Sequence, residues 1–233
     1  MSGPDPARGV EVPCRDGRVF RLAPRKTALL VIDMQRDFCA PEGASAKAGE
    51  NVEPLRAIVP LLVRVVAAAR AHGLTVVHTR EGHLPDLSDL TDAKRERSHA
   101  AGAEIGASGP LGRMLVRGEF GHDFIDELRP NPGEAVFDKP GFGAFYATDL
   151  EAHLRQRGID HVILTGVTTQ CCVQSTLREA VDRGYFCLTL EDCTAAFERR
   201  WHDATFDIIA SEGHLFGSVT SGALLIEALR GGT

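Results

Sequence analysis

The sequence has no apolar segment long enough to cross a membrane, and its N-terminus lacks the apolar core of a signal peptide. Its longest apolar stretch, residues 57–71, is interrupted by Arg64 and Arg70. These absences exclude a membrane-spanning protein and predict a cytoplasmic location.

Clusters of basic residues are also missing. The chain carries 26 Lys and Arg against 32 Asp and Glu, and its formal net charge is −6. Nucleic acids and anionic membranes attract basic surfaces, so neither is expected as a partner. The chain also has no G-x-G-x-x-G or Walker sequence, which disfavours a nucleotide-binding domain.

Six cysteines are present, but no pair has C-x-x-C spacing. A zinc knuckle or a thioredoxin-like motif is therefore disfavoured. Without a signal peptide, reduced thiols are expected rather than disulfides.

Short apolar runs alternate with helical patterns along most of the chain. The runs cover residues 28–33, 75–78, 135–137, 161–165 and 186–190. This alternation predicts an α/β three-layer sandwich, in which a central, mostly parallel sheet carries helices on both faces. Residues 1–26 read as an irregular N-terminal arm, and residues 27–233 read as one domain.

Residues 80–118 depart from that pattern because they are polar, rich in glycine and weakly periodic. A long segment of this kind inside a compact domain is usually a lid, a binding loop or a subunit contact. The segment is therefore expected to be a lid or interface insertion.

Reactive side chains follow three of the predicted strands. Asp33 ends the first strand, Lys139 follows the third, and the fourth leads into the turn GVTTQCC, which holds Cys171 and Cys172. Parallel α/β sheets form their sites beyond the carboxyl ends of the strands, so these side chains are expected to converge. Spacing alone does not choose between the two cysteines.

A cysteine at the start of a helix suits acyl transfer. The helix dipole and a nearby lysine are expected to lower the pKa of the thiol from about 8.5. The free backbone N–H groups there can hold the oxyanion of a tetrahedral intermediate. Asp33, after five apolar residues, is expected to have a raised pKa and to accept the thiol proton.

Plainer readings of the same residues remain open at this point. A cysteine at a helix start often serves only in packing, and an aspartate after a strand is commonly a turn or cap residue. Lys139 precedes Pro140 and is equally consistent with a solvated loop.

Five segments of the sequence help to choose between the catalytic and the structural readings of these residues. They read ALLVIDMQRDF (28–38), VVHTREGH (76–83), FDKPGFGAF (137–145), LTGVTTQCCV (164–173) and LEDCTAAF (190–197). With these segments in this order, the sequence resembles the isochorismatase-like cysteine hydrolases. The resemblance implies a catalytic triad of Asp33, Lys139 and Cys172, with Cys171 at a variable position.

The resemblance also implies a cis peptide between Val167 and Thr168, and an oxyanion hole formed by the N–H groups of Thr168 and Cys172. Members with a cysteine in the nucleophile position hydrolyse amide-type C–N bonds without a cofactor. The nicotinamidase branch carries a D-x-H metal cluster after its second strand. That spacing is absent around His83, so no metal is expected.

Within the superfamily, the sequence looks most like biuret and triuret hydrolases, which implies a small linear ureide or amide as substrate. Candidate residues for binding it are Phe38, Arg80, Glu81, Phe142, Phe145 and Glu212. Glu212 stands where those enzymes are expected to carry glutamine. Phe38 and Phe145 are equally consistent with core packing, Arg80 and Glu81 with a subunit salt bridge, and Glu212 with a surface position.

Two kinds of alternative stay open, another substrate and another class of protein. The substrate could be ureidoacrylate, maleamate or nicotinamide instead of biuret. The protein could also be a non-catalytic thiol or binding protein that uses the Cys171–Cys172 pair. The resemblance further implies a homodimer or homotetramer.

Overall fold

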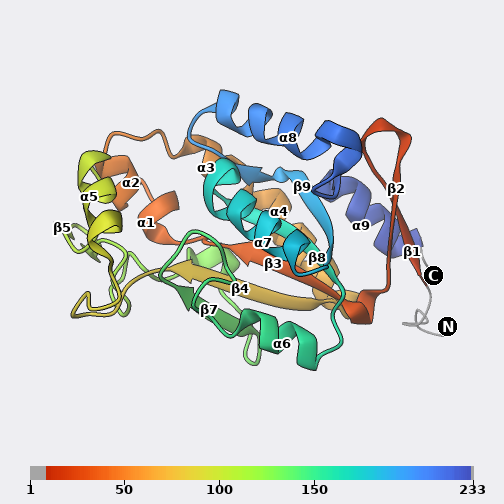
Figure 1. The fold of residues 1–233 in the computed structure, drawn as a ribbon, viewed down its shortest axis with the longest axis horizontal. Helices are drawn as coiled ribbons and strands as arrows, with labels where there is room; N and C mark the ends of the chain where they lie inside the picture. The colour runs from red at the N-terminus through yellow and green to blue at the C-terminus, as the bar shows by residue number, and fades with distance from the viewer. Residues whose placement is uncertain (1–8, 232–233) are drawn as a thin grey trace.

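The computed structural model describes residues 9–231, and its centre is a six-stranded sheet (Figure 1). The strands are β3 (Thr27–Ile32), β4 (Thr75–Glu81), β7 (Ala135–Lys139), β8 (His161–Val167), β9 (Phe186–Ala195) and β10 (Ser218–Thr220). They lie in the order β10-β9-β8-β3-β4-β7, and every neighbouring pair is parallel. The predicted α/β sandwich is therefore confirmed.

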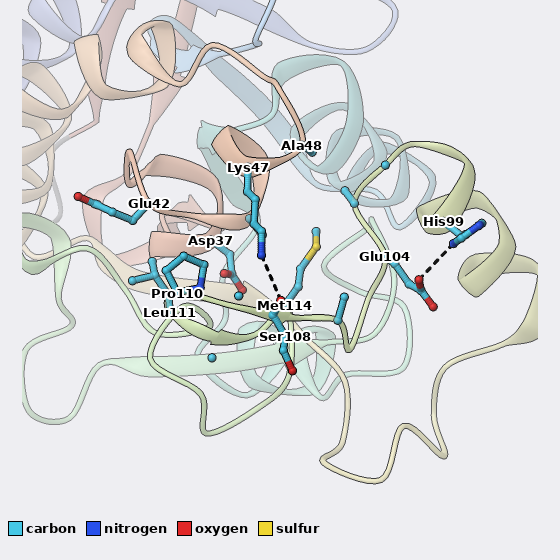
Figure 2. Close-up of a pocket in the computed structure, with 16 residues that line it drawn as sticks. Asp37, Glu42, Lys47, Ala48, His99, Glu104, Ser108, Pro110, Leu111 and Met114 are labelled. Carbon is cyan, nitrogen blue, oxygen red and sulfur yellow. Dashed lines mark hydrogen bonds and ion pairs between the residues drawn. The ribbon is translucent and has the colours of Figure 1, made fainter.

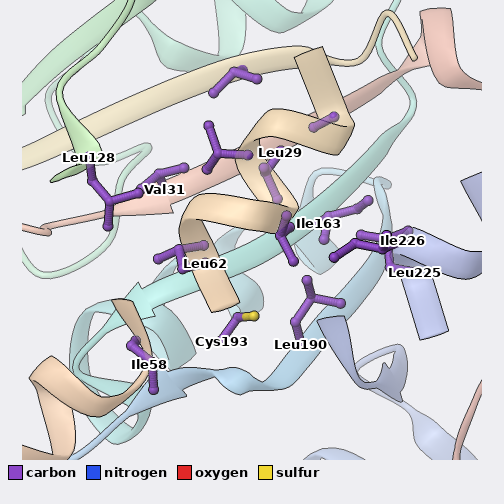
Figure 3. Close-up of a cluster of buried hydrophobic side chains, with 14 of the residues drawn as sticks. Leu29, Val31, Ile58, Leu62, Leu128, Ile163, Leu190, Cys193, Leu225 and Ile226 are labelled. Atoms are coloured by element: carbon purple, nitrogen blue, oxygen red, sulfur yellow. The ribbon is translucent and has the colours of Figure 1, made fainter. Parts of the chain in front are cut away.

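One face of the sheet is covered by α3 (Glu53–Ala57), α4 (Val59–Ala71) and α9 (Gly222–Gly231). Apolar side chains from these helices pack on alternate residues of the strands. Figure 3 shows Leu62 and Leu225 in one cluster with Leu29 and Ile163 of the strands. All six residues of β3 are buried, as expected for a central strand covered on both faces.

The opposite face is covered by α6 (Leu150–Gln156), α7 (Gln174–Asp182) and α8 (Arg199–His214). The backbone of α8 leaves helical geometry at residues 211–213. The two helix layers fix the sheet between them, and so they fix the positions of the strand ends. None of the helices in the described residues is long and apolar enough to cross a membrane.

The expectation of an irregular N-terminal arm is wrong for residues 10–22. Strands β1 (Val10–Pro13) and β2 (Val19–Leu22) form an antiparallel pair, joined by the 3-10 turn η1 (Arg15–Gly17). Val12 and Leu22 from this pair are buried in the same core as α9. Apolar residues alternate along both strands, and this alternation is what allows one face of the pair to pack. Residues 1–8 lie outside the described residues.

The segment 80–118 begins inside β4, because Arg80 and Glu81 are its last two residues. It also contains α5 (Asp92–Ala100) and the short pair β5 (Ser108–Gly109) and β6 (Gly112–Arg113). Figure 1 shows α5 next to α1 (Arg36–Cys39) and α2 (Ala44–Lys47), beyond the carboxyl ends of β3 and β4. The segment therefore lies over the edge where the reactive side chains were expected.

Candidate active site

Asp33 and Lys139 form a buried ion pair at the carboxyl ends of β3 and β7. Lys139 Nζ lies 2.7 Å from Asp33 Oδ2, and both side chains are 0% exposed. Lys139 also donates to the carbonyl of Gly141 at 3.0 Å. The Thr79 hydroxyl donates to Asp33 Oδ1 at 2.7 Å, so both carboxylate oxygens have a partner.

These contacts and the burial set the charges of the pair. Burial raises the pKa of Asp33, and Glu81 adds to that rise, while Lys139 and Thr79 oppose it. Burial alone would lower the pKa of Lys139, but the surrounding acidic groups raise it. Lys139 therefore stays an ammonium, and Asp33 is a stronger base than an exposed aspartate.

Cys172 lies in a single π-helical turn, η4 (Thr169–Val173), between β8 and α7. The peptide between Val167 and Thr168 is cis. The Cys172 sulfur, one oxygen of Asp33 and one oxygen of Glu81 lie within 4.8 Å of one another. The structure thus brings the three residues of the expected triad together, and it adds Glu81 to them.

The expected low pKa of the Cys172 thiol is wrong. A hydrogen bond to Cys171 and burial raise the pKa of Cys172 well above its ordinary value, and Asp33 and Glu81 raise it further. Lys139 opposes this rise without overcoming it. The expectation counted the helix start and the lysine but not the two carboxylates beside the sulfur. The resting group is therefore a thiol, and its proton must leave when it attacks.

Glu81, the last residue of β4, is a carboxylate in contact with the sulfur. Cys172 Sγ donates to Glu81 Oε2 at 3.4 Å, and Lys139 Nζ lies 3.9 Å from the same oxygen. The Gln35 side chain accepts from the backbone N–H of Glu81 and donates to its carbonyl, which fixes the end of β4.

Lys94, which was not among the expected site residues, completes the group. Its ammonium reaches from α5 to Glu81 Oε1 at 2.5 Å and to the carbonyl of Pro140 at 2.6 Å. Burial would raise the pKa of Glu81, but the positive charges of Lys139 and Lys94 lower it below its usual value. The sequence signal for Lys94 was weak, because α5 is polar all round and only its fold across the strand ends brings the lysine here.

A cavity of about 360 Å³ opens onto Cys172. Its wall includes Glu81, Lys94, Arg97, Thr168, Cys171, Cys172, Phe38 and Phe142. Among the described residues, Asp33 and Lys139 are not part of this wall, and they lie behind it with no exposed surface. The cavity is large enough for a small linear molecule. Of the three residues of the expected triad, Cys172 is the one whose side chain reaches the cavity wall.

The expected substrate-binding residues divide into two groups. Phe38, Glu81 and Phe142 line the cavity. Arg80 points to the other side of β4, because successive strand residues face opposite ways, and it pairs with Asp138 and Asp123.

Phe145 and Glu212 also lie away from the cavity wall. Phe145 is 5% exposed and packs in the core against Tyr185. Glu212 is exposed at the distorted end of α8, with a φ of 49°. The structure does not bring Arg80, Phe145 and Glu212 to the wall of this cavity, and their part in substrate binding stays a prediction.

A second cavity of about 350 Å³ lies beside the first (Figure 2). The two share Ala48, Ala103 and Met114 in their walls. Figure 2 shows the Met114 side chain between Lys47 and Glu104. A flexible thioether therefore forms part of the boundary between the two cavities.

The cluster of Asp33, Glu81 and Cys172 has the donor atoms of a metal site. The positive charge that balances these carboxylates, however, comes from lysine side chains of the chain itself. The Lys139 ammonium lies against one oxygen of each carboxylate, and Lys94 holds the other oxygen of Glu81. These oxygens are already engaged by ammonium groups, so the arrangement does not fit a metal ion.

Comparison with known proteins gives a consistent result. The family model for the isochorismatase domain matches residues 27–223. The ureidoacrylate amidohydrolase RutB of Serratia proteamaculans is 33% identical over 175 residues, which cover 74% of this chain and 71% of that protein.

Two solved structures extend the similarity to the fold. A cysteine hydrolase from Pseudomonas syringae pv. phaseolicola is 27% identical, with a TM-score of 0.78 and complete coverage of both chains. An N-carbamoylsarcosine amidase from Thermoplasma acidophilum is 26% identical, with a TM-score of 0.64 over 84% of this chain and 96% of that one.

Proposed function

The chain belongs to the isochorismatase domain family, and on this premise we propose that it is a cysteine-dependent amidohydrolase. Its substrate is a small linear ureide or amide of the biuret type, and the reaction passes through a covalent acyl-enzyme. The observation that carries the proposal is the buried group of Asp33, Lys139 and Cys172, with the sulfur alone of the three in the wall of a cavity.

The first half of the reaction forms the acyl-enzyme. Asp33, whose pKa is raised by burial, takes the thiol proton as the sulfur attacks the carbonyl carbon. The N–H groups of Thr168 and Cys172 hold the oxyanion. The C–N bond then breaks, the new bond joins sulfur to carbon, and Asp33 returns the proton to the leaving nitrogen.

The second half releases the acid. Water enters the cavity, gives a proton to Asp33 and attacks the acyl carbon. The carbon–sulfur bond then breaks, and Asp33 returns its proton to the sulfur, so the thiol re-forms. Lys139 stays positively charged throughout, and it compensates the charge on Asp33 whenever that carboxylate is ionised. No metal ion is needed to balance these steps.

An ammonia-release screen tests the proposal. Biuret, triuret, guanylurea, ureidoacrylate, maleamate and nicotinamide are each incubated with the protein, with Cys172→Ala and with Cys14→Ser. Cys14 lies outside the cavity wall and serves as the matched thiol control. We expect turnover by the wild type and by Cys14→Ser, no turnover by Cys172→Ala, and an acyl adduct on Cys172 in the intact mass.

Two results would overturn the proposal. Full turnover by Cys172→Ala would remove the nucleophile. A loss of two mass units that depends on oxidant, with no turnover of any amide, would indicate the thiol-redox alternative at Cys171 and Cys172.

A second substrate has its own support. The similarity to a ureidoacrylate amidohydrolase favours a ureide that carries a carboxylate. Arg97 lines the cavity, and within residues 9–231 no acidic group is paired with it. A free guanidinium at that place suits a carboxylate. The same screen separates ureidoacrylate from biuret.

A further inference from the structure

The proposed acyl transfer leaves one buried carboxylate without a role. Glu81 is 4% exposed, and it contacts the attacking sulfur and the ammonium groups of Lys94 and Lys139. A buried carboxylate costs free energy to desolvate and is kept where its charge has partners. Glu81 has partners on both oxygens, so the fold holds it in one orientation.

Two carboxylates lie near the sulfur, and one of them, Glu81, lines the cavity. Among the described residues, Glu81 belongs to the cavity wall and Asp33 does not. Asp33 is closed off by Lys139 and Thr79 and is 0% exposed. A substrate carbonyl placed at the sulfur therefore has the Glu81 oxygens beside its substituents, while Asp33 lies behind the cavity wall, within 4.8 Å of the sulfur, and exchanges protons there.

The surroundings also separate the two groups in charge. Burial raises the pKa of Asp33. Burial acts in the same direction on Glu81, but Lys139 and Lys94 together lower its pKa. Asp33 is thus suited to moving a proton and Glu81 to remaining an anion, and two carboxylates whose pKa values are pushed apart commonly divide their work in this way.

An ionised carboxylate accepts hydrogen bonds and cannot donate them. In the free protein Glu81 Oε2 accepts a hydrogen bond from the Cys172 thiol at 3.4 Å. That bond is lost when the thiol proton leaves, so the oxygen needs another donor during the reaction. An amide attacked by the sulfur brings the N–H of the bond that is being cleaved as a donor beside this oxygen.

We propose that Glu81 binds the substrate, accepting the N–H of the scissile amide in place of the thiol, and thereby selects amides over esters of the same acid. This rests on the proposed function. Glu81 stays ionised throughout: the thiol proton passes to Asp33 and on to the leaving nitrogen, sulfur–carbon replaces carbon–nitrogen, and ammonia or an amine departs.

The arrangement has a second consequence for the sulfur. The negative charges of Glu81 and Asp33 stand beside Cys172 and are opposed there by Lys139, while Lys94 pairs with Glu81. Removing the charge of Glu81 leaves Lys94 without its partner near the sulfur. The thiol then becomes easier to ionise, although binding of the amide becomes weaker. A variant that failed to fold would instead lose both the reactivity of the thiol and the binding of the amide.

The experiment compares the wild type, Glu81→Gln and Glu96→Gln. Glu96 is an exposed glutamate of α5 and serves as the matched control. The substrates are the amide that the ammonia screen identifies and the ethyl ester of the same acyl group. For biuret the ester is ethyl allophanate. A third measurement follows the reaction of Cys172 with methyl methanethiosulfonate, which has no N–H, as a function of pH.

For Glu81→Gln we expect kcat/KM on the amide to fall roughly 10- to 100-fold, the loss of a hydrogen bond to a charged group. We expect the ester to change by less than about 3-fold, and the methanethiosulfonate profile to move to lower pH. Glu96→Gln should match the wild type in all three measurements. Equal losses on amide and ester, or a profile that moves to higher pH, would overturn the proposal.

A measurement on the wild type needs no folded variant. N-methyl and N,N-dimethyl forms of the same amide differ in that only the first keeps an N–H. We expect the dimethyl form to be cleaved at least about 10-fold more slowly; equal rates would overturn the proposal. If only the role of Glu81 is wrong, ammonia release that depends on Cys172 is still observed. If the proposed function itself is wrong, that ammonia release is absent.

Discussion

The Lys139 ammonium lies 2.7 Å from the Asp33 carboxylate, and neither side chain has any exposed surface. A pair of this kind is costly to break from one side, because the remaining charge is left buried without its partner. Removing one member of such a pair usually costs about 3–5 kcal/mol, whereas replacing both costs much less.

The first prediction concerns this pair. Lys139→Met should lower the free energy of unfolding by about 3–5 kcal/mol, and the double variant Asp33→Asn, Lys139→Met should lose less than the sum of the single losses. Urea unfolding of the four proteins measures the coupling. Strictly additive losses would contradict it.

The pH dependence of Lys139→Met gives a further check with a definite sign. Without the ammonium, the pKa of Asp33 in the folded protein is raised further above that in the unfolded chain. The folded state then binds the proton more tightly, and its stability falls as pH rises through that raised value. The deficit of Lys139→Met relative to wild type should therefore be smaller at pH 5 than at pH 8.

The ends of the strands were predictable from the sequence because parallel strands bring their carboxyl ends to one edge. That rule alone led to Asp33, Lys139 and the turn that holds Cys172. The resemblance selected Cys172 from the two cysteines. The sequence could not supply the sign of the thiol pKa shift, which depends on the hydrogen bond to Cys171, on burial and on the carboxylates beside the sulfur.

Residues whose role depends on strand register were harder to assign. Arg80 and Glu81 are neighbours in the sequence, yet they face opposite sides of β4. The register pairs Glu81 with Lys139 and Arg80 with Asp138. Glu81 therefore joins the site, and Arg80 forms an ion pair with Asp138 outside it. Lys94 could not be found at all from periodicity, because its place follows from how α5 lies across the strand ends.

The second prediction concerns Lys94. All nine residues of α5 retain solvent exposure, so the contact of Lys94 with Glu81 and Pro140 is a main tie between this helix and the strand ends. Lys94→Met should speed amide hydrogen exchange in α5 and lower kcat/KM by about 10-fold. Arg95→Met, on the same helix and exposed, is the control. Unchanged exchange in α5 would contradict the tie.

The third prediction concerns Arg97, which lines the cavity. If a carboxylate substrate binds, its charge should meet this guanidinium. Arg97→Met should then raise KM for ureidoacrylate roughly 10-fold and leave KM for biuret nearly unchanged, because biuret is uncharged. Initial rates over a range of each substrate measure the split, with Arg95→Met as control. A similar rise for both substrates would show that Arg97 acts on cavity shape rather than on charge.

The fourth prediction concerns His122, which is 1% exposed and lies against Gly82. Burial lowers its pKa to about 4, with Arg80 and Arg117 adding to the effect and Asp138 opposing it. Between about pH 6.5 and pH 4 the unfolded chain binds a proton at this histidine that the folded protein does not. Stability therefore falls with acidification across this window, by at most about 1.4 kcal/mol per pH unit from this group.

In His122→Gln the free energy of unfolding, measured in urea at pH 7, 5.5 and 4.5, should decline less steeply than in the wild type. Equal slopes in the two proteins would mean that the imidazole is as easily protonated in the folded state as in the unfolded chain, and that the pocket around it admits the charge.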